Sequence, residues 1–76
     1  MSEFNGHKNW NHWNVSLWIN NDEGLYNMGR RALRVAKNKD TAAKMIYEEL
    51  TAIGVDKTPD GAPYSVTTIR AALADW

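Results

Sequence analysis

Residues 10–22 read Trp-Asn-His-Trp-Asn-Val-Ser-Leu-Trp-Ile-Asn-Asn-Asp, the densest aromatic stretch in a chain of 76 residues. Trp10, Trp13 and Leu17 recur at helical spacing and share one face, which Trp18 widens. Because apolar side chains also occupy other sides of this segment, we expect a short helix at the centre of the fold. A strand over Val-Ser-Leu-Trp-Ile is the alternative, since β-branched and aromatic residues favour strands.

The ends of this first helix and the start of the next are set by asparagine. Asn9 or Asn11 is a suitable N-cap for the first helix, because a short polar side chain can accept from the backbone N–H groups of the first turn. Asn20 and Glu23 have the spacing of a capping box, which predicts a second helix that ends near Lys37. Its apolar stripe is Leu25, Met28, Gly29, Ala32, Leu33 and Ala36. A glycine in that stripe predicts the close approach of another helix or an aromatic ring.

Two more helices are predicted in the second half of the chain. Asp40 or Thr41 can cap a third helix that runs to about Ile53, where Gly54 is well placed as a left-handed stop. A turn-rich loop follows, and Ser65 can cap a last helix. The apolar positions at helical spacing on these two helices are Ala43, Ile46, Tyr47, Leu50, Ile53, Val66, Ile69, Leu73 and Trp76.

Together these patterns predict an all-α fold, a compact bundle of about four short helices with an aromatic-rich core. The core should depend on the four Trp and three Tyr, since the chain has no Cys and cannot form a disulfide. We expect residues 1–9 to be a flexible N-terminal arm and residues 10–76 to be a single helical domain. No signal peptide or membrane span is recognisable, so the expected location is the cytoplasm.

The sequence offers no arrangement typical of an enzyme or a metal site. His7 and His12 lie five positions apart, with no Cys in the chain, and the adjacent Glu48 and Glu49 project about 100° apart on a helix. Ser65 is better explained as a cap than as a nucleophile. We therefore predict a protein that binds rather than catalyses, with no cofactor and no metal.

Charge is the strongest indication of a binding surface. The net charge is zero, which excludes an acidic mimic of DNA, yet six basic residues and one acid lie between Arg30 and Lys44. Guanidinium groups pair well with carboxylates and phosphates, so this run predicts a contact with an anionic partner. The predicted partner-binding residues are Arg30, Arg31, Arg34, Lys37, Lys44 and Tyr26. In the alternative, a nucleic-acid-binding module, the contacts come from Arg30, Arg34, Lys37, Lys39 and Arg70.

The segment Asn-Trp-Asn-His-Trp-Asn-Val-Ser-Leu-Trp-Ile-Asn-Asn-Asp-Glu-Gly-Leu-Tyr, residues 9–26, resembles the opening of a family of small proteins encoded mainly by bacteriophages. His12 stands where that family usually has Thr. The resemblance implies a phage origin and an accessory role inside a bacterial host cell. It suggests stoichiometric binding to a host or viral protein or nucleoprotein complex, with inhibition or modulation of a host factor such as a defence system as the result.

A second segment, residues 50–73, is similar to a helix–loop–helix stretch in the DNA-binding region of large serine recombinases. The similarity is carried by a glycine-containing helix end, by Thr58-Pro59-Asp60-Gly61 and by an aromatic-Ser cap before the last helix. It implies a helix-turn-helix-like C-terminal half and supports the nucleic-acid alternative. The last helix offers one basic residue, Arg70.

Overall fold

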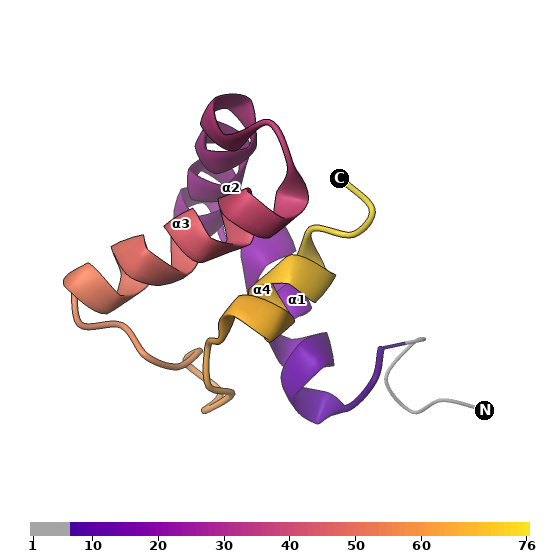
Figure 1. Ribbon diagram of the computed structural model, residues 1–76. Coiled ribbons are helices and arrows are strands. Elements are labelled where there is room, and N and C mark those ends of the chain that lie inside the picture. The colour runs from indigo at the N-terminus through magenta and orange to yellow at the C-terminus, as the bar shows by residue number, and fades with distance from the viewer. Residues whose placement is uncertain (1–6) are drawn as a thin grey trace.

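The computed structural model describes residues 7–76, which form four α-helices and no strand apart from an isolated bridge between Lys57 and Pro63 (Figure 1). The helices are α1 (Trp10–Asn21), α2 (Glu23–Ala36), α3 (Lys39–Ala52) and α4 (Val66–Ala72). The predicted all-α bundle is therefore confirmed, and the strand alternative for the first segment is wrong. Most of the predicted N-terminal arm lies outside the described residues.

Side-chain caps fix where α1 and α2 begin. The Asn9 side chain accepts a 3.0 Å hydrogen bond from the backbone N–H of His12, as one of the two predicted caps. The predicted cap of α2 was wrong: Asp22, not Asn20, accepts from the N–H of Leu25 at 3.0 Å. The reason is that α1 continues through Asn20, whose amide donates back to the carbonyl of Ser16.

A similar correction applies to α3. Its cap is Asn38, whose side chain accepts from the N–H of Thr41 at 2.7 Å, so neither Asp40 nor Thr41 is the cap. Asn38 is available because α2 ends at Ala36 and its C-cap, Lys37, has a left-handed backbone with φ 70°.

The predictions for the end of α3 and the start of α4 are confirmed. Gly54 has φ 80° and donates to Thr51 O, while the next N–H bonds Leu50 O, which is the Schellman pattern. Ser65 and Thr68 form a reciprocal capping box at the start of α4.

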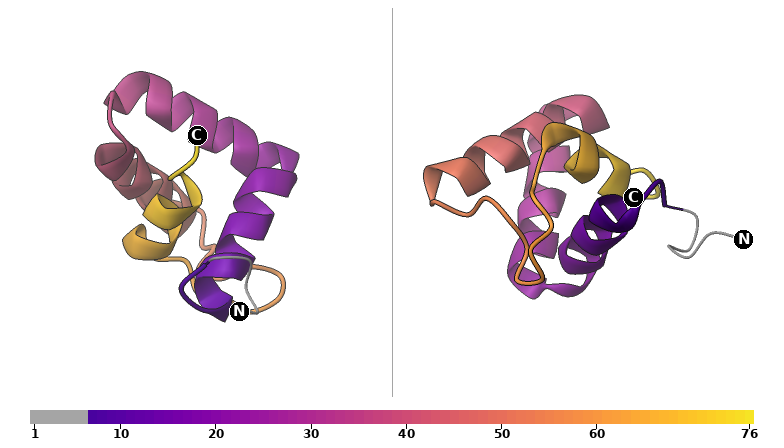
Figure 2. Two further views of the ribbon diagram at one scale, coloured as in Figure 1. Left: turned by 90° about the vertical axis from the view of Figure 1, so that its right-hand side faces the viewer. Right: turned by 90° about the horizontal axis from the view of Figure 1, so that it is seen from below.

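The helices are arranged so that the first and the last lie together. The chain turns sharply at Asp22, between α1 and α2, and α4 packs against both α1 and α3 (Figure 2). α2 packs on α3 and α1. Buried aliphatic residues from α1, α3 and α4 form most of the core, with Val15, Ile46 and Leu73 all 0–1% exposed.

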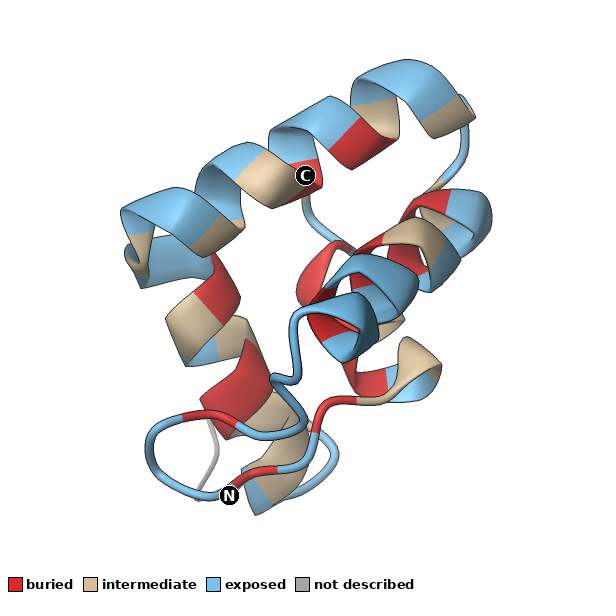
Figure 3. Cartoon of the chain, turned by 90° about the vertical axis from the view of Figure 1, so that its left-hand side faces the viewer, coloured by how far each residue is buried: buried red, intermediate tan, exposed pale blue. Residues whose placement is uncertain are grey.

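The aromatic-rich core is not confirmed, and α1 is not apolar contact surface on all sides, as a helix at the centre of the fold would be. Tyr64 is the single aromatic residue in the buried core of the described residues. α1 buries Asn14, Val15 and Ile19, whereas Trp10 and Leu17 remain 38% exposed. Figure 3 shows that buried and exposed segments occur along the same helices. The compact aliphatic side chains fit the contact with α4. Indole rings are large and carry an N–H that needs a partner, which favours positions at the edge of a core.

Two of the exposed apolar residues belong to a predicted inner stripe. Tyr47 and Ile53 of the third helix were expected inside, yet they are 38% and 63% exposed. Ala43, Ile46 and Leu50 are buried as predicted, and Ala42 is buried with them, so the inner face of α3 lies further toward the Ala42 side. Among residues 7–76, no helix is long and apolar enough to cross a membrane.

Candidate functional site

Four of the predicted partner-binding residues form one row along α2. Tyr26, Arg30, Arg34 and Lys37 follow one another at spacings of three or four residues, so they share a side of the helix, and all four are exposed. We call this row the α2 basic edge. The guanidinium of Arg30 donates to the Tyr26 hydroxyl at 3.3 Å and its carbon lies 5.9 Å from the ring centroid. This contact orients Arg30 beside an aromatic ring without neutralising its charge.

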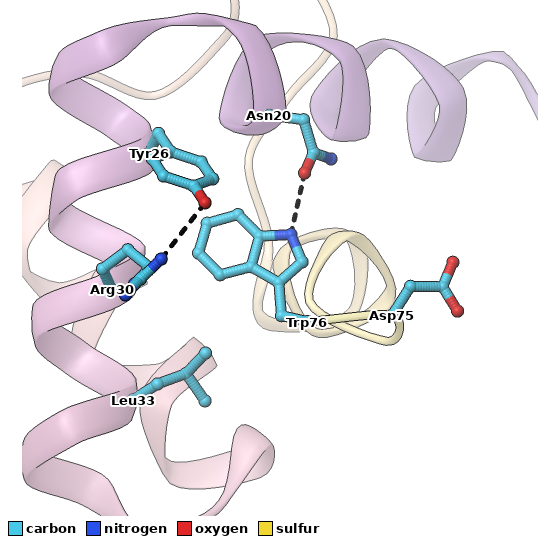
Figure 4. A pocket seen from close by; sticks show the side chains of 6 residues that line it. All are labelled: Asn20, Tyr26, Arg30, Leu33, Asp75 and Trp76. Carbon is cyan, nitrogen blue, oxygen red and sulfur yellow. Dashed lines mark hydrogen bonds between the residues drawn. The ribbon is translucent and has the colours of Figure 1, made fainter.

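A pocket of about 360 Å³ lies beside the N-terminal half of this edge (Figure 4). Trp76 forms one wall: its indole lies 4.9 Å from the Tyr26 ring, centroid to centroid, and its Nε1 donates to Asn20 at 2.8 Å. Leu33 adds an apolar wall and Asp75 a carboxylate. The pocket thus combines an aromatic surface with the cation of Arg30 at its boundary.

Gly29 explains why Trp76 can lie there. A Cβ atom at this position would come within 2.7 and 2.8 Å of two ring carbons of Trp76, closer than real contacts allow. The predicted close approach at Gly29 is therefore confirmed, and the approaching group is an aromatic ring from the chain end. Trp76 was predicted on the inner face of the last helix, and it serves instead as a bridge from the end of α4 to α2.

The remaining predicted cations are divided between free and internally bound groups. Arg31 forms an ion pair with Glu49 at 3.5 Å, with both side chains largely exposed. Lys39 donates from Nζ to the carbonyl of Ala74 at 2.7 Å. Within residues 7–76, Arg34, Lys37 and Lys44 have no ion pair. Lys44 is exposed on α3, so it is not part of the α2 row.

Arg70, from the nucleic-acid alternative, is also bound internally. Its Nε donates to Asp40 at 2.6 Å, which joins α4 to the first turn of α3. Together with Lys39, two of the five predicted nucleic-acid contacts are engaged within the protein. The other three, Arg30, Arg34 and Lys37, are the cations of the α2 basic edge.

Lys37 is a charged residue with a strained backbone conformation. It is the one residue other than glycine with positive φ in the described part of the chain, at 70°. Non-glycine residues pay roughly 1–2 kcal/mol for this conformation. A glycine would suit the backbone better, so the lysine contributes a cation at the end of the α2 basic edge at a cost in stability.

A polar network that was not predicted from the sequence joins the two segments that carry the resemblances, residues 9–26 and 50–73. The side chain of Asn14, 1% exposed, accepts from the Thr58 hydroxyl at 2.5 Å and donates to Asp60 at 2.9 Å. The same carboxylate oxygen accepts from Trp18 Nε1 at 2.9 Å. Thr58 Oγ1 in turn accepts from the N–H of Ala62. We call these four side chains, Asn14, Trp18, Thr58 and Asp60, the loop latch.

The loop latch lowers the pKa of Asp60, chiefly through the hydrogen bond from Asn14 and then through that from Trp18. The turn Thr58-Pro59-Asp60-Gly61 thus fastens the loop before α4 to α1. The sequence feature that could have indicated this network is the pair Asn14 and Trp18. The two residues lie one helical turn apart, so their side chains are on the same side of the helix and can reach one partner. The distinctive residues of both motifs therefore have a structural role.

No group of three or more His, Asp or Glu residues within residues 7–76 is arranged to hold a metal ion. His12 has a lowered pKa, mainly because of partial burial and then because of the positive charge of Lys8. Burial raises the pKa of the Tyr64 hydroxyl, and the charge of Asp22 adds to the effect. Neither His12 nor Tyr64 lines the pocket beside the α2 basic edge.

Comparison with known proteins identifies a family whose function is unknown. The model of a family described as "Family of unknown function (DUF7249)" matches residues 1–74. No curated protein matches the chain, and no solved structure matches it.

Proposed function

We propose that this chain, which belongs to that family of unknown function, is a small phage-type accessory protein that acts by binding another macromolecule stoichiometrically. In this proposal the target is a host or viral protein or nucleoprotein complex, and binding inhibits or modulates a host factor such as a defence system. The protein works in the cytoplasm of the bacterial host cell, as a binding protein and not an enzyme, without a cofactor. Phage origin rests on the similarity of residues 9–26 to small phage proteins.

One observation carries the choice of surface: the α2 basic edge adjoins the pocket walled by Tyr26 and Trp76. Trp, Tyr and Arg are the residue types most enriched among those that dominate binding energy at protein interfaces. Here one of each lies around a single pocket, with Arg34 one turn further along α2. This arrangement favours a protein surface that inserts an apolar side chain next to a carboxylate.

The nucleic-acid alternative is less well supported by the same geometry. Lys39 and Arg70 are engaged internally, and the seven-residue α4 presents Arg70 as its single cation, already paired with Asp40. Recognition helices need cations free to approach phosphates. What favours the alternative is the unpaired row Arg30, Arg34 and Lys37, which phosphates could also contact.

The test is a capture experiment from bacterial host lysate with charge-matched variants. The double variant Arg30→Glu/Arg34→Glu changes two free cations of the α2 basic edge. Its control, Lys39→Glu/Arg70→Glu, makes the same charge change at two cations that are bound within the protein and are not among the predicted partner-binding residues. We expect the first variant to lose the captured partner and the control to keep it, with folding of both checked by circular dichroism.

Equal loss in both variants would show that capture depends on total charge and not on this site. Equal retention would show that the α2 basic edge is the wrong surface. A gel-shift series on random DNA and RNA at several salt concentrations tests the nucleic-acid alternative. If the protein contacts phosphates, its affinity should fall by roughly 0.9 log units per log unit of salt for each contact.

A further inference from the structure

A second pocket lies away from the α2 basic edge. It is an apolar groove of about 440 Å³ between the start of α2, the end of α3 and the loop before α4. Its walls include Trp18, Leu25, Met28, Ile53, Val55 and Tyr64. Ile53 is 63% exposed and Val55 36%, so apolar surface is open to solvent there.

The loop latch keeps the groove preformed. Trp18 lines it and at the same time donates to Asp60, and Pro59, next to Asp60, also lines it. Asn14, buried and fully hydrogen-bonded, holds the same turn from below. A preformed site avoids the cost of ordering a loop during binding. Met28 adds an unbranched side chain that adapts to different apolar partners.

Acidic residues are frequent in the segments that form this groove. Asp22 lines it, and Glu23, Asp56 and Asp60 are exposed residues that are each adjacent in sequence to a residue that lines it. Lys57 is the single base among its lining residues. Glu49, which neighbours the floor residue Leu50, is already paired with Arg31. The lining is mostly apolar, with Asp22 and Lys57 as its charged residues, and three more exposed acidic residues are next to lining residues in the sequence. This excess of acidic residues favours a partner that is apolar in the middle and cationic at its edges.

We propose that this groove binds a basic amphipathic segment of a partner protein, with apolar side chains in the groove and flanking Lys or Arg residues near the carboxylates. A helical segment is the occupant that this shape favours, because a helix presents apolar side chains at three- and four-residue spacing on one side. The surface is separate from the α2 basic edge, and its surroundings are richer in acidic than in basic residues. The protein therefore has two binding surfaces of different chemistry.

The experiment uses the full chain and two synthetic peptides. Both have leucines at i, i+3 and i+7, with lysine at the other positions of one peptide and glutamate at those of the second. Binding is followed by amide chemical shifts and by Trp fluorescence. We expect the lysine peptide to bind and to shift the amides of Leu25, Met28, Ile53 and Val55, and we expect the glutamate peptide not to bind.

Matched variants locate the contact. Ile53→Lys should weaken binding of the lysine peptide at least about tenfold, which corresponds to roughly 1.4 kcal/mol. Val35→Lys makes the same change at an equally exposed apolar residue, 67% against 63%, outside the groove and should leave affinity unchanged. Lys57→Glu should tighten binding several-fold, since it removes the one base from the groove.

Several outcomes would overturn the proposal. Equal binding of both peptides would mean that charge plays no part, and equal weakening by Val35→Lys would place the contact elsewhere. Concentration-dependent self-association that Ile53→Lys abolishes would make a second copy of this chain the occupant. Arg30→Glu/Arg34→Glu should not affect peptide binding, so failure here is distinguishable from failure of the α2 basic edge.

Discussion

The indole of Trp18 donates to the carboxylate of Asp60 at 2.9 Å, across 42 positions of the sequence. With Asn14 and Thr58, this bond fixes a loop of turn-forming residues against the first helix. The bond therefore connects a helix near the start of the chain to the segment that leads into the last helix.

Removal of Asn14 should destabilise the protein more than any exposed polar residue of α1. Asn14→Ala leaves the Thr58 hydroxyl without its buried acceptor, and an unsatisfied buried group costs about 1–3 kcal/mol. Asn21→Ala is the control, because its amide makes only an exposed bond to Leu17 O. Urea denaturation should show a lower midpoint for Asn14→Ala and a near-unchanged one for Asn21→Ala. Equal midpoints would mean that the loop latch contributes no stability.

Stability should depend on the charge of Asp60 at acid pH. Hydrogen bonds from Asn14 and Trp18 lower its pKa in the folded state, so folding favours the ionised form. The stabilisation by ionised Asp60 is complete above the ordinary aspartate pKa of about 3.9. It is lost as the pH falls through the lower pKa that Asp60 has in the folded protein. Asp60→Asn removes this titration. The stability advantage of the native chain over Asp60→Asn, measured by urea midpoints, should therefore shrink below about pH 4. A constant difference between pH 6 and pH 3 would contradict this account.

Gly29 and Trp76 should be energetically coupled. Alanine is favoured over glycine in a helix by about 1 kcal/mol, yet a Cβ at position 29 would lie 2.7 Å from the Trp76 ring. In a Trp76→Ala background, Gly29→Ala should raise the free energy of unfolding by that amount. In the native background the gain should be cancelled, because the ring must move and give up its bond to Asn20.

A double-mutant cycle measures this coupling directly. Trp fluorescence of the single variant Gly29→Ala gives an independent reading of whether the indole has moved. Additive effects of the two substitutions would show that Trp76 does not pack on α2 in solution.

Lys37→Gly should stabilise the protein while weakening partner binding. The left-handed backbone at this helix end favours glycine by about 1 kcal/mol, less the added freedom of the unfolded chain. Lys44→Gly is the matched control: it makes the same change inside α3 and should lower stability by about 1 kcal/mol. Thermal denaturation tests the first effect, and capture of the partner identified through the α2 basic edge tests the second. A destabilised Lys37→Gly would mean that the lysine makes a compensating contact.

Local chemistry made much of this fold predictable. Asn9, Gly54 and Ser65 act at helix ends where short polar side chains or a positive φ have a direct effect, and all three were identified from sequence. The stop at Gly54 needs no tertiary information, because its hydrogen bonds run to residues of its own helix.

The burial of α1 could not be predicted in the same way. Trp10, Trp13 and Leu17 make the more hydrophobic stripe, yet the helix turns Val15 and Ile19 inward. That orientation depends on contacts with α4 and on Asn14, whose partners come from a distant loop. For the candidate site, the row on α2 followed from spacing, whereas the internal pairing of Arg70 and the position of Trp76 depend on packing between helices.

The neighbouring positions of α1 and α4 affect the order in which the protein can become stable during synthesis. Until the residues of α4 have left the ribosome, α1 lacks the helix with which it makes its most extensive contact, and the latch partner of Asn14 has only just been made. The first helix is therefore only partly covered while the residues before α4 are being made. Stability should appear in one late step, and fragments that lack α4 should be rapidly degraded by cellular proteases.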